Sequence, residues 1–125
     1  MTSDIVTRML SILVVDDDQP VLHTVADVVE ALGHACFRAY SVEEALNIAA
    51  QHLIQATILD LNIGEDDGLS TLRQLLRLNA SLRAVLMSGA LTDEVRAEAG
   101  RLGVRRVLDK PLNLEDLRGA VYRLQ

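Results

Sequence analysis

The chain has 125 residues, 50% of them hydrophobic, and this size and composition suit a single domain with its own core. The net charge of −6 disfavours nucleic acid as a direct partner, because phosphate backbones attract clustered cations. No apolar run is long enough to cross a membrane, and the first residues lack the apolar stretch of a signal peptide. Cys36 is the single cysteine, which excludes an intramolecular disulfide and fits a reducing, cytoplasmic setting.

The first half of the chain predicts two strand–helix units. An apolar run at 12–15, rich in β-branched residues, predicts a strand that is buried on both faces. The apolar stripe that follows Pro20 predicts a helix, since proline suits a first helical turn. A weaker run at 35–40 predicts an edge strand. Ser41 with Glu44 three residues later is a capping-box pattern, which opens a second helix.

The second half predicts three further units. Apolar runs at 56–59 and 84–87 predict buried strands, and the arginine-containing run at 104–108 predicts the other edge strand. The residues that mark the three helices are Leu69, Leu72, Leu75 and Leu76, then Thr92, then Asn113 with Leu114, Leu117, Val121 and Leu124 facing inward. The helix after Thr92 is polar and contains Gly100, so we expect it to be the least stable.

Alternating strands and helices indicate an α/β fold, in which a doubly wound parallel sheet is covered by helices on both faces. Residues 1–9 show no pattern and are interpreted as a leader, which leaves residues 10–125 for the domain. In such sheets, ligands bind beyond the carboxyl ends of the strands, where the strand order reverses. We therefore expect the chemistry of this chain at that edge.

Acidic and polar residues stand at these predicted strand ends. Asp16 and Asp17 follow the first strand, Asp60 the third, Ser88 the fourth and Lys110 the fifth. Neighbouring strands lie about 4.8 Å apart, and two carboxylates ~5 Å apart repel by roughly 3 kcal/mol at an effective dielectric constant near 20. A cation removes this penalty, and oxygen ligands without histidine or cysteine indicate Mg²⁺.

The same residues have the chemistry for phosphoryl transfer. Asp60 can act as the nucleophile that forms an acyl phosphate. A bound cation, the Lys110 ammonium and the Ser88 hydroxyl can then neutralise the phosphoryl oxygens. Each residue alone also has a simpler interpretation, and Asp18 is best explained as a helix cap. We favour the site because these residues occur together, and because Lys110 is the single lysine in the chain. Residues 65–67 are expected to form a solvated loop over it.

These segments resemble the receiver domain of two-component response regulators, across residues 11–124. The resemblance rests on four segments in this order and spacing, at residues 12–18, 58–60 with Asp67 and Gly68, 86–90, and 109–111. It implies a five-stranded sheet in the order 2-1-3-4-5, counted along the chain. It also implies that Asp60 is phosphorylated from the phosphohistidine of a histidine kinase or a histidine phosphotransfer protein. Such a chain is a signalling phosphoacceptor and not an enzyme, beyond catalysing its own phosphorylation and dephosphorylation.

The resemblance further implies roles for single residues. The implied Mg²⁺ ligands are Asp16, Asp17, Asp60 and the backbone carbonyl of Asn62. Ser88 would move toward the phosphoryl group, Lys110 would pair with it, and the Lys110–Pro111 peptide bond would be cis. The last two helices and the last strand would pass the state to an output domain or a downstream protein. Homodimerisation stays open, as does whether the chain is a stand-alone receiver or a fragment of a larger regulator.

Three positions depart from the family pattern, and one of them is Leu112, which replaces a frequent Phe after Pro111. Val107 stands where Tyr or Phe is usual, and a valine cannot swing a ring inward. Gly64 replaces a common proline, which should loosen the loop after Asp60. Val107 supports one alternative, a receiver-like interaction module that is not switched by phosphorylation. A second alternative is a Mg²⁺-dependent phosphohydrolase of the haloacid-dehalogenase kind, in which Asp16 of the Asp16-x-Asp18 pattern is the nucleophile, although Pro20 stands where that motif has Thr or Val.

Overall fold

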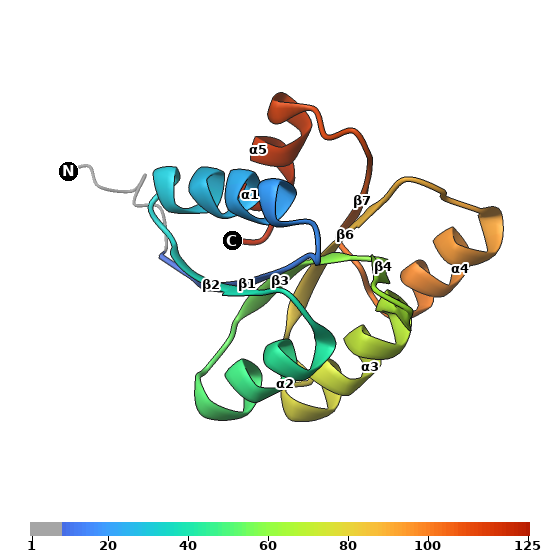
Figure 1. Cartoon of the computed structure of the whole chain (residues 1–125), viewed down its shortest axis with the longest axis horizontal. Coiled ribbons are helices and arrows are strands. Elements are labelled where there is room, and N and C mark those ends of the chain that lie inside the picture. Colours follow the sequence, from blue (N-terminus) through green and yellow to red (C-terminus); the bar gives the residue numbers. More distant parts are fainter. Residues whose placement is uncertain (1–8) are drawn as a thin grey trace.

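The computed structural model describes residues 9–125, which form a parallel sheet with helices on both faces (Figure 1). The strands of the sheet are β1 (Ser11–Val15), β2 (Ala35–Ala39), β3 (Ala56–Asp60), β6 (Arg83–Ser88) and β7 (Arg106–Asp109). The helices are α1 (Gln19–Ala31), α2 (Val42–Gln51), α3 (Gly68–Leu78), α4 (Asp93–Arg101) and α5 (Leu114–Tyr122). The leader predicted over residues 1–9 lies outside the described residues, apart from Met9. No helix in the described part is long and apolar enough to span a bilayer.

The sheet confirms the predicted strand order. Its strands lie in the order β2-β1-β3-β6-β7, all parallel, so β2 and β7 are the edges. The order reverses between β1 and β3, since the chain first moves from β1 to β2 and then returns to the other side of β1. That reversal places the carboxyl ends of β1 and β3 at the point where ligands bind in such sheets.

The core consists of two apolar layers, one on each face of the sheet. Alternate residues of β1 point to opposite faces, so Ile12 packs toward α1 and α5 while Leu13 packs toward α2 and α3. Figure 1 shows α1 and α5 on one side of the sheet and α2, α3 and α4 on the other. Coverage on both faces explains why the central strands are continuously apolar in sequence.

Side chains cap the helices much as predicted, with one difference in detail. The N-caps are Asp18, Ser41, Asp67, Thr92 and Asn113. Ser41 Oγ accepts a hydrogen bond from the Glu44 N–H at 3.1 Å. The Glu44 carboxylate, however, accepts from the N–H of Tyr40 at 2.8 Å, and not from that of Ser41 as in a capping box.

Two predictions about local structure were wrong. Leu114 is 46% exposed, because it is the first residue of α5 and lies on the turn before the buried stripe begins. Residues 65–67, predicted as a loop, belong in part to a small antiparallel hairpin of β4 (Asn62–Ile63) and β5 (Asp66–Asp67). The predicted cis peptide bond between Lys110 and Pro111 is present.

Candidate functional site

The strand register brings the predicted site residues to one edge of the sheet. Val15 of β1 pairs with Leu59 of β3, so Asp16 and Asp60 are the next residues on the two neighbouring strands. Asp60 in turn pairs with Met87 of β6, one residue before Ser88. Ser88 pairs with Asp109 of β7, which Lys110 follows directly. Segments that are far apart in the sequence therefore meet at the site.

Lys110 bridges the two buried carboxylates of the site. Its Nζ lies 2.9 Å from Asp16 Oδ2 and 3.1 Å from Asp60 Oδ2. Asp16 is fully buried and Asp60 is 4% exposed, whereas 23% of the Lys110 side chain remains accessible. The Lys110 backbone N–H also donates to the Ser88 carbonyl at 2.8 Å, which holds the lysine to the end of β6. The ammonium is thus fixed between both acids and reachable from solvent.

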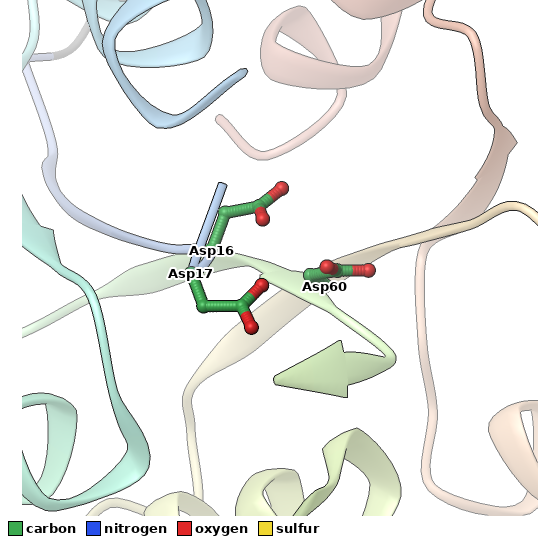
Figure 2. A group of neighbouring side chains, drawn as sticks. All are labelled: Asp16, Asp17 and Asp60. Carbon is green, nitrogen blue, oxygen red and sulfur yellow. The ribbon is translucent and has the colours of Figure 1, made fainter. Parts of the chain in front are cut away.

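Asp17 completes an acidic cluster with Asp16 and Asp60. Figure 2 shows the three carboxylates together at the ends of β1 and β3, and each offers an oxygen atom within 4.8 Å of the others. One oxygen of each carboxylate accepts a backbone N–H: Asp16 from Asp18 at 2.9 Å, Asp17 from Gly64 at 2.7 Å and Asp60 from Asn62 at 3.3 Å. These hydrogen bonds orient acids that repel one another.

The electrostatics of the cluster show how the charges are balanced. Burial raises the pKa of Asp60, and repulsion from Asp16 raises it further, while the hydrogen bond and charge of Lys110 act in the opposite direction. Burial acts to lower the pKa of Lys110, but its contacts with Asp16 and Asp60 outweigh burial and raise it. One ammonium faces three carboxylates, so the cluster keeps an excess of negative charge.

This arrangement fits a hard divalent cation. The donors are carboxylate oxygens, close enough to share one ion, and their excess negative charge is the penalty that a cation removes. Histidine and cysteine, which favour zinc, are absent from the cluster. The residues present are therefore able to bind a metal ion.

Within the described part of the chain, the side chains of the other two predicted site residues make no hydrogen bond to the cluster. Ser88 is buried at the end of β6, and its hydroxyl accepts the Ala90 N–H at 3.0 Å. Among the described residues, the Ser88 hydroxyl makes no hydrogen bond to the side chain of Asp60 or of Lys110. Asn62 is exposed and contacts Asp60 through its backbone N–H. Its carbonyl as a metal ligand stays a prediction.

Two glycines shape the site in ways that the sequence analysis did not identify. A Cβ atom on Gly68 would lie 2.5 Å from Leu61 Cα and 2.6 Å from the Asp60 carbonyl oxygen, so a side chain cannot fit there. Gly68 thus lets the start of α3 approach the end of β3. Gly64 donates its N–H to Asp17, 47 residues away. The pair Asp67-Gly68 was part of the family pattern, but no sequence signal pointed to the contact of Gly64.

Known proteins similar to this chain share its family and its fold. A family model described as the response regulator receiver domain matches residues 12–122. The transcriptional regulatory protein ZraR of Salmonella typhimurium is 29% identical over 108 residues, which are 86% of this chain and 24% of that protein. The chain thus spans about a quarter of the length of that relative.

Two solved structures are similar over most of the chain. The crystal structure of a response regulator from Burkholderia pseudomallei, described with a phosphorylated aspartic acid, a calcium ion and citrate, is 29% identical, with a TM-score of 0.81. The match covers 90% of this chain and 66% of that one. A receiver domain protein from Methanospirillum hungatei has a TM-score of 0.85 and covers 93% of both chains, and at 21% identity it supports the fold alone.

Proposed function

The chain belongs to the response regulator receiver domain family, and we propose that Asp60 accepts its phosphoryl group. A receiver domain is a signalling phosphoacceptor of two-component systems rather than an enzyme. The observation that carries this proposal is the Lys110 ammonium, 3.1 Å from Asp60 Oδ2 inside the acidic cluster. A carboxylate at that position has a fixed cation beside it and two further acids that can share a metal ion. The domain itself is proposed to extend over residues 10–125, of which the family model matches 12–122.

The proposed reaction transfers the phosphoryl group from a phosphohistidine to an Asp60 oxygen. An O–P bond forms, the P–N bond of the donor breaks, and its electron pair returns to the imidazole nitrogen. Asp60 must be ionised to attack, and Lys110 favours this form by lowering the pKa that burial raises. Lys110 also lies where it can bind an oxygen of the transferred group, since it already contacts the acceptor.

We propose Mg²⁺ as the resident cation, held by Asp16, Asp17, Asp60 and the carbonyl of Asn62. When bound, it would neutralise charge on the transferred phosphoryl oxygens. The all-oxygen donor set supports Mg²⁺ over zinc. Ser88 is proposed to leave its hydrogen bond with Ala90 and donate its hydroxyl to the phosphoryl group, which would displace the start of the segment leading to α4.

A receiver domain implies a kinase partner, and we propose that a histidine kinase or histidine phosphotransfer protein docks beside Lys110. A groove of about 540 Å³ opens there. It is lined by Asp18, Pro20, Val21, Thr24, Lys110, Pro111 and Leu112. Its apolar lining next to the acceptor suits a protein that must present a phosphohistidine to Asp60.

The setting and the output of the domain are also proposals. Curated relatives such as ZraR are larger transcriptional regulators, so we propose that the state of this domain passes to an output domain or a downstream protein. Direct nucleic-acid binding is not proposed, given the net charge of −6. A cytoplasmic setting and a homodimer stay predictions.

The experiment is to incubate the protein with Mg²⁺ and acetyl phosphate and to measure its intact mass. The wild type is expected to gain one phosphoryl group, and Asp60→Asn none. Asp66→Asn is the matched control, because Asp66 is an exposed acid of the neighbouring hairpin outside the cluster. It should be labelled as the wild type is.

Other outcomes would favour the other two functions. Label retained in Asp60→Asn and lost in Asp16→Asn would indicate the phosphohydrolase. No label in any variant, with Mg²⁺ binding measured separately, would indicate the interaction module, for which Val107 is the structural argument. Val107 is a partly buried aliphatic residue that packs against the apolar layer on the α2, α3 and α4 side of the sheet, and it has no ring to rotate.

A further inference from the structure

Asp17 differs from the other two acids of the cluster in how it is held. Asp16 and Asp60 are buried and both contact Lys110. Asp17 is exposed and forms no ion pair within residues 9–125. Its one hydrogen bond in this part of the chain comes from the Gly64 N–H, at 2.7 Å to Oδ2. An exposed carboxylate with no other partner would exchange among several rotamers, so this contact decides the orientation of the Asp17 carboxylate.

The shape of the β4–β5 hairpin makes the Gly64 N–H available. Gly64 and Glu65 form a two-residue loop between Ile63 and Asp66, and Gly64 has a φ of +60°. Glycine at the first loop position is the pattern of a type II′ hairpin turn. The loop residues stand outside the paired residues of the hairpin, so the N–H of Gly64 is free to point at Asp17.

We propose that the Gly64 backbone amide is a positioning group for the metal site, which fixes Asp17 Oδ2 and leaves Oδ1 for the cation. This inference rests on the proposed function, in which Asp17 is a Mg²⁺ ligand. Proline, which the family often has at this place, has no N–H to donate. The hairpin tip of this chain therefore takes part in orienting a ligand that comes from the end of β1, 47 residues earlier.

Three substitutions separate the amide from the conformation of the turn. Gly64→Pro removes the donor, whereas Gly64→Ala and Gly64→Asn keep it, and asparagine also tolerates positive φ. Added Cβ atoms meet nothing within 4 Å, but a φ of +60° strains any L residue, so Gly64→Ala and Gly64→Asn report the effect of a strained turn that keeps its N–H. Mg²⁺ affinity, measured by calorimetric titration, should fall roughly threefold to tenfold in Gly64→Pro and stay within about twofold of wild type in Gly64→Asn. Gly64→Ala should follow Gly64→Asn, and an alanine variant as weak as the proline variant would overturn the inference.

A second readout needs no metal and no proline. In the metal-free wild type, the Gly64 amide should exchange slowly with solvent deuterium and its proton resonance should lie downfield. Both features should be lost in Asp17→Ala. An amide that exchanges equally fast in both proteins would overturn the inference. If the wild type bound no Mg²⁺, the proposal of Mg²⁺ as the cofactor would be wrong, and so would the positioning role that rests on it. Normal wild-type binding that Gly64→Pro leaves unchanged would refute the positioning role alone.

Discussion

Helices α1 and α4 both begin next to the site, yet they are attached to the rest of the domain in different ways. α1 follows Asp16 and Asp17, and α4 follows Ser88 by a short loop. Both have a side-chain N-cap. α1 buries four residues, whereas α4 buries only Ala99. Figure 1 shows α1 lying over the sheet beside α5, and α4 at the right-hand end of the molecule.

Polar contacts replace much of this burial at α4. Arg73 of α3 pairs with Glu98 at 2.8 Å, and Glu98 also pairs with Arg101 within α4. Such exposed pairs contribute little to stability and can be exchanged for contacts with water. The metal-binding side of the site is therefore built on a rigid helix, and the Ser88 side on a loosely held one. Elements that move in a conformational switch come from the less stable parts of a fold, which supports the proposed movement on the Ser88 side.

The largest expected effect comes from the core of α1. Leu22 is fully buried, so Leu22→Ala should lower the free energy of unfolding by about 2–5 kcal/mol. Val95 of α4 is only partly buried, so Val95→Ala should cost about 1 kcal/mol or less. Urea unfolding of both variants tests the comparison. Equal losses would show that α4 is as firmly packed as α1.

An intermediate effect is expected from the charge of Asp60. Its pKa is raised by burial and by Asp16, so the ionised form is less favourable in the folded protein than in the unfolded chain. The free-energy cost of ionising Asp60 in the folded protein is fully present at a pH above the folded-state pKa of Asp60. It is absent at a pH well below the ordinary aspartate pKa of 3.8. Metal-free Asp60→Asn should therefore be more stable than wild type at pH 7, and the difference should shrink as the pH falls toward 3.8.

Hydrogen exchange on the same variant sharpens the comparison of the two helices. Amides of α1 that exchange only on global unfolding should slow down in Asp60→Asn, since global stability rises. Amides of α4 are expected to exchange through local opening, so their exchange should change little. Slowing of equal size in both helices would mean that α4 opens only with the whole domain.

The fold was predictable because its signals are local and repeated. Apolar runs marked the strands, and capping residues such as Ser41 and Asn113 marked the starts of helices. The alternation of the two then determined a parallel sheet. The strand-end rule predicts that Asp16, Asp60 and Lys110 meet, and in the structure the Lys110 Nζ lies 2.9 Å from Asp16 Oδ2 and 3.1 Å from Asp60 Oδ2.

The parts that could not be predicted depend on short elements and on backbone geometry. β4 and β5 have two residues each, too few to show a period, so the hairpin that carries Gly64 had no sequence signal. Its contact with Asp17 uses a backbone N–H, which every residue except proline carries. The close approach of Gly68 to Leu61 is likewise a property of the packed backbone. Leu114 fits the helical stripe by spacing, but its place at the first turn exposes it.

The smallest expected effect on global stability comes from Glu98→Gln, and it is the most selective for α4. The hydrogen bonds of Arg73, and then of Arg101, hold the pKa of Glu98 below its usual range. The ionised pairs therefore stabilise the fold fully at any pH above the ordinary glutamate pKa. This stabilisation is lost as the pH falls through the lowered pKa of Glu98 in the folded protein. At neutral pH, Glu98→Gln should leave the urea midpoint almost unchanged while α4 amides exchange faster and α1 amides do not. Arg101→Gln is the matched control, because it leaves the Arg73–Glu98 pair between the helices intact. If Arg101→Gln loosened α4 as much as Glu98→Gln does, the contact with α3 would not be what holds this helix, and its attachment would have to lie in the partly buried Val95 and the buried Ala99 instead.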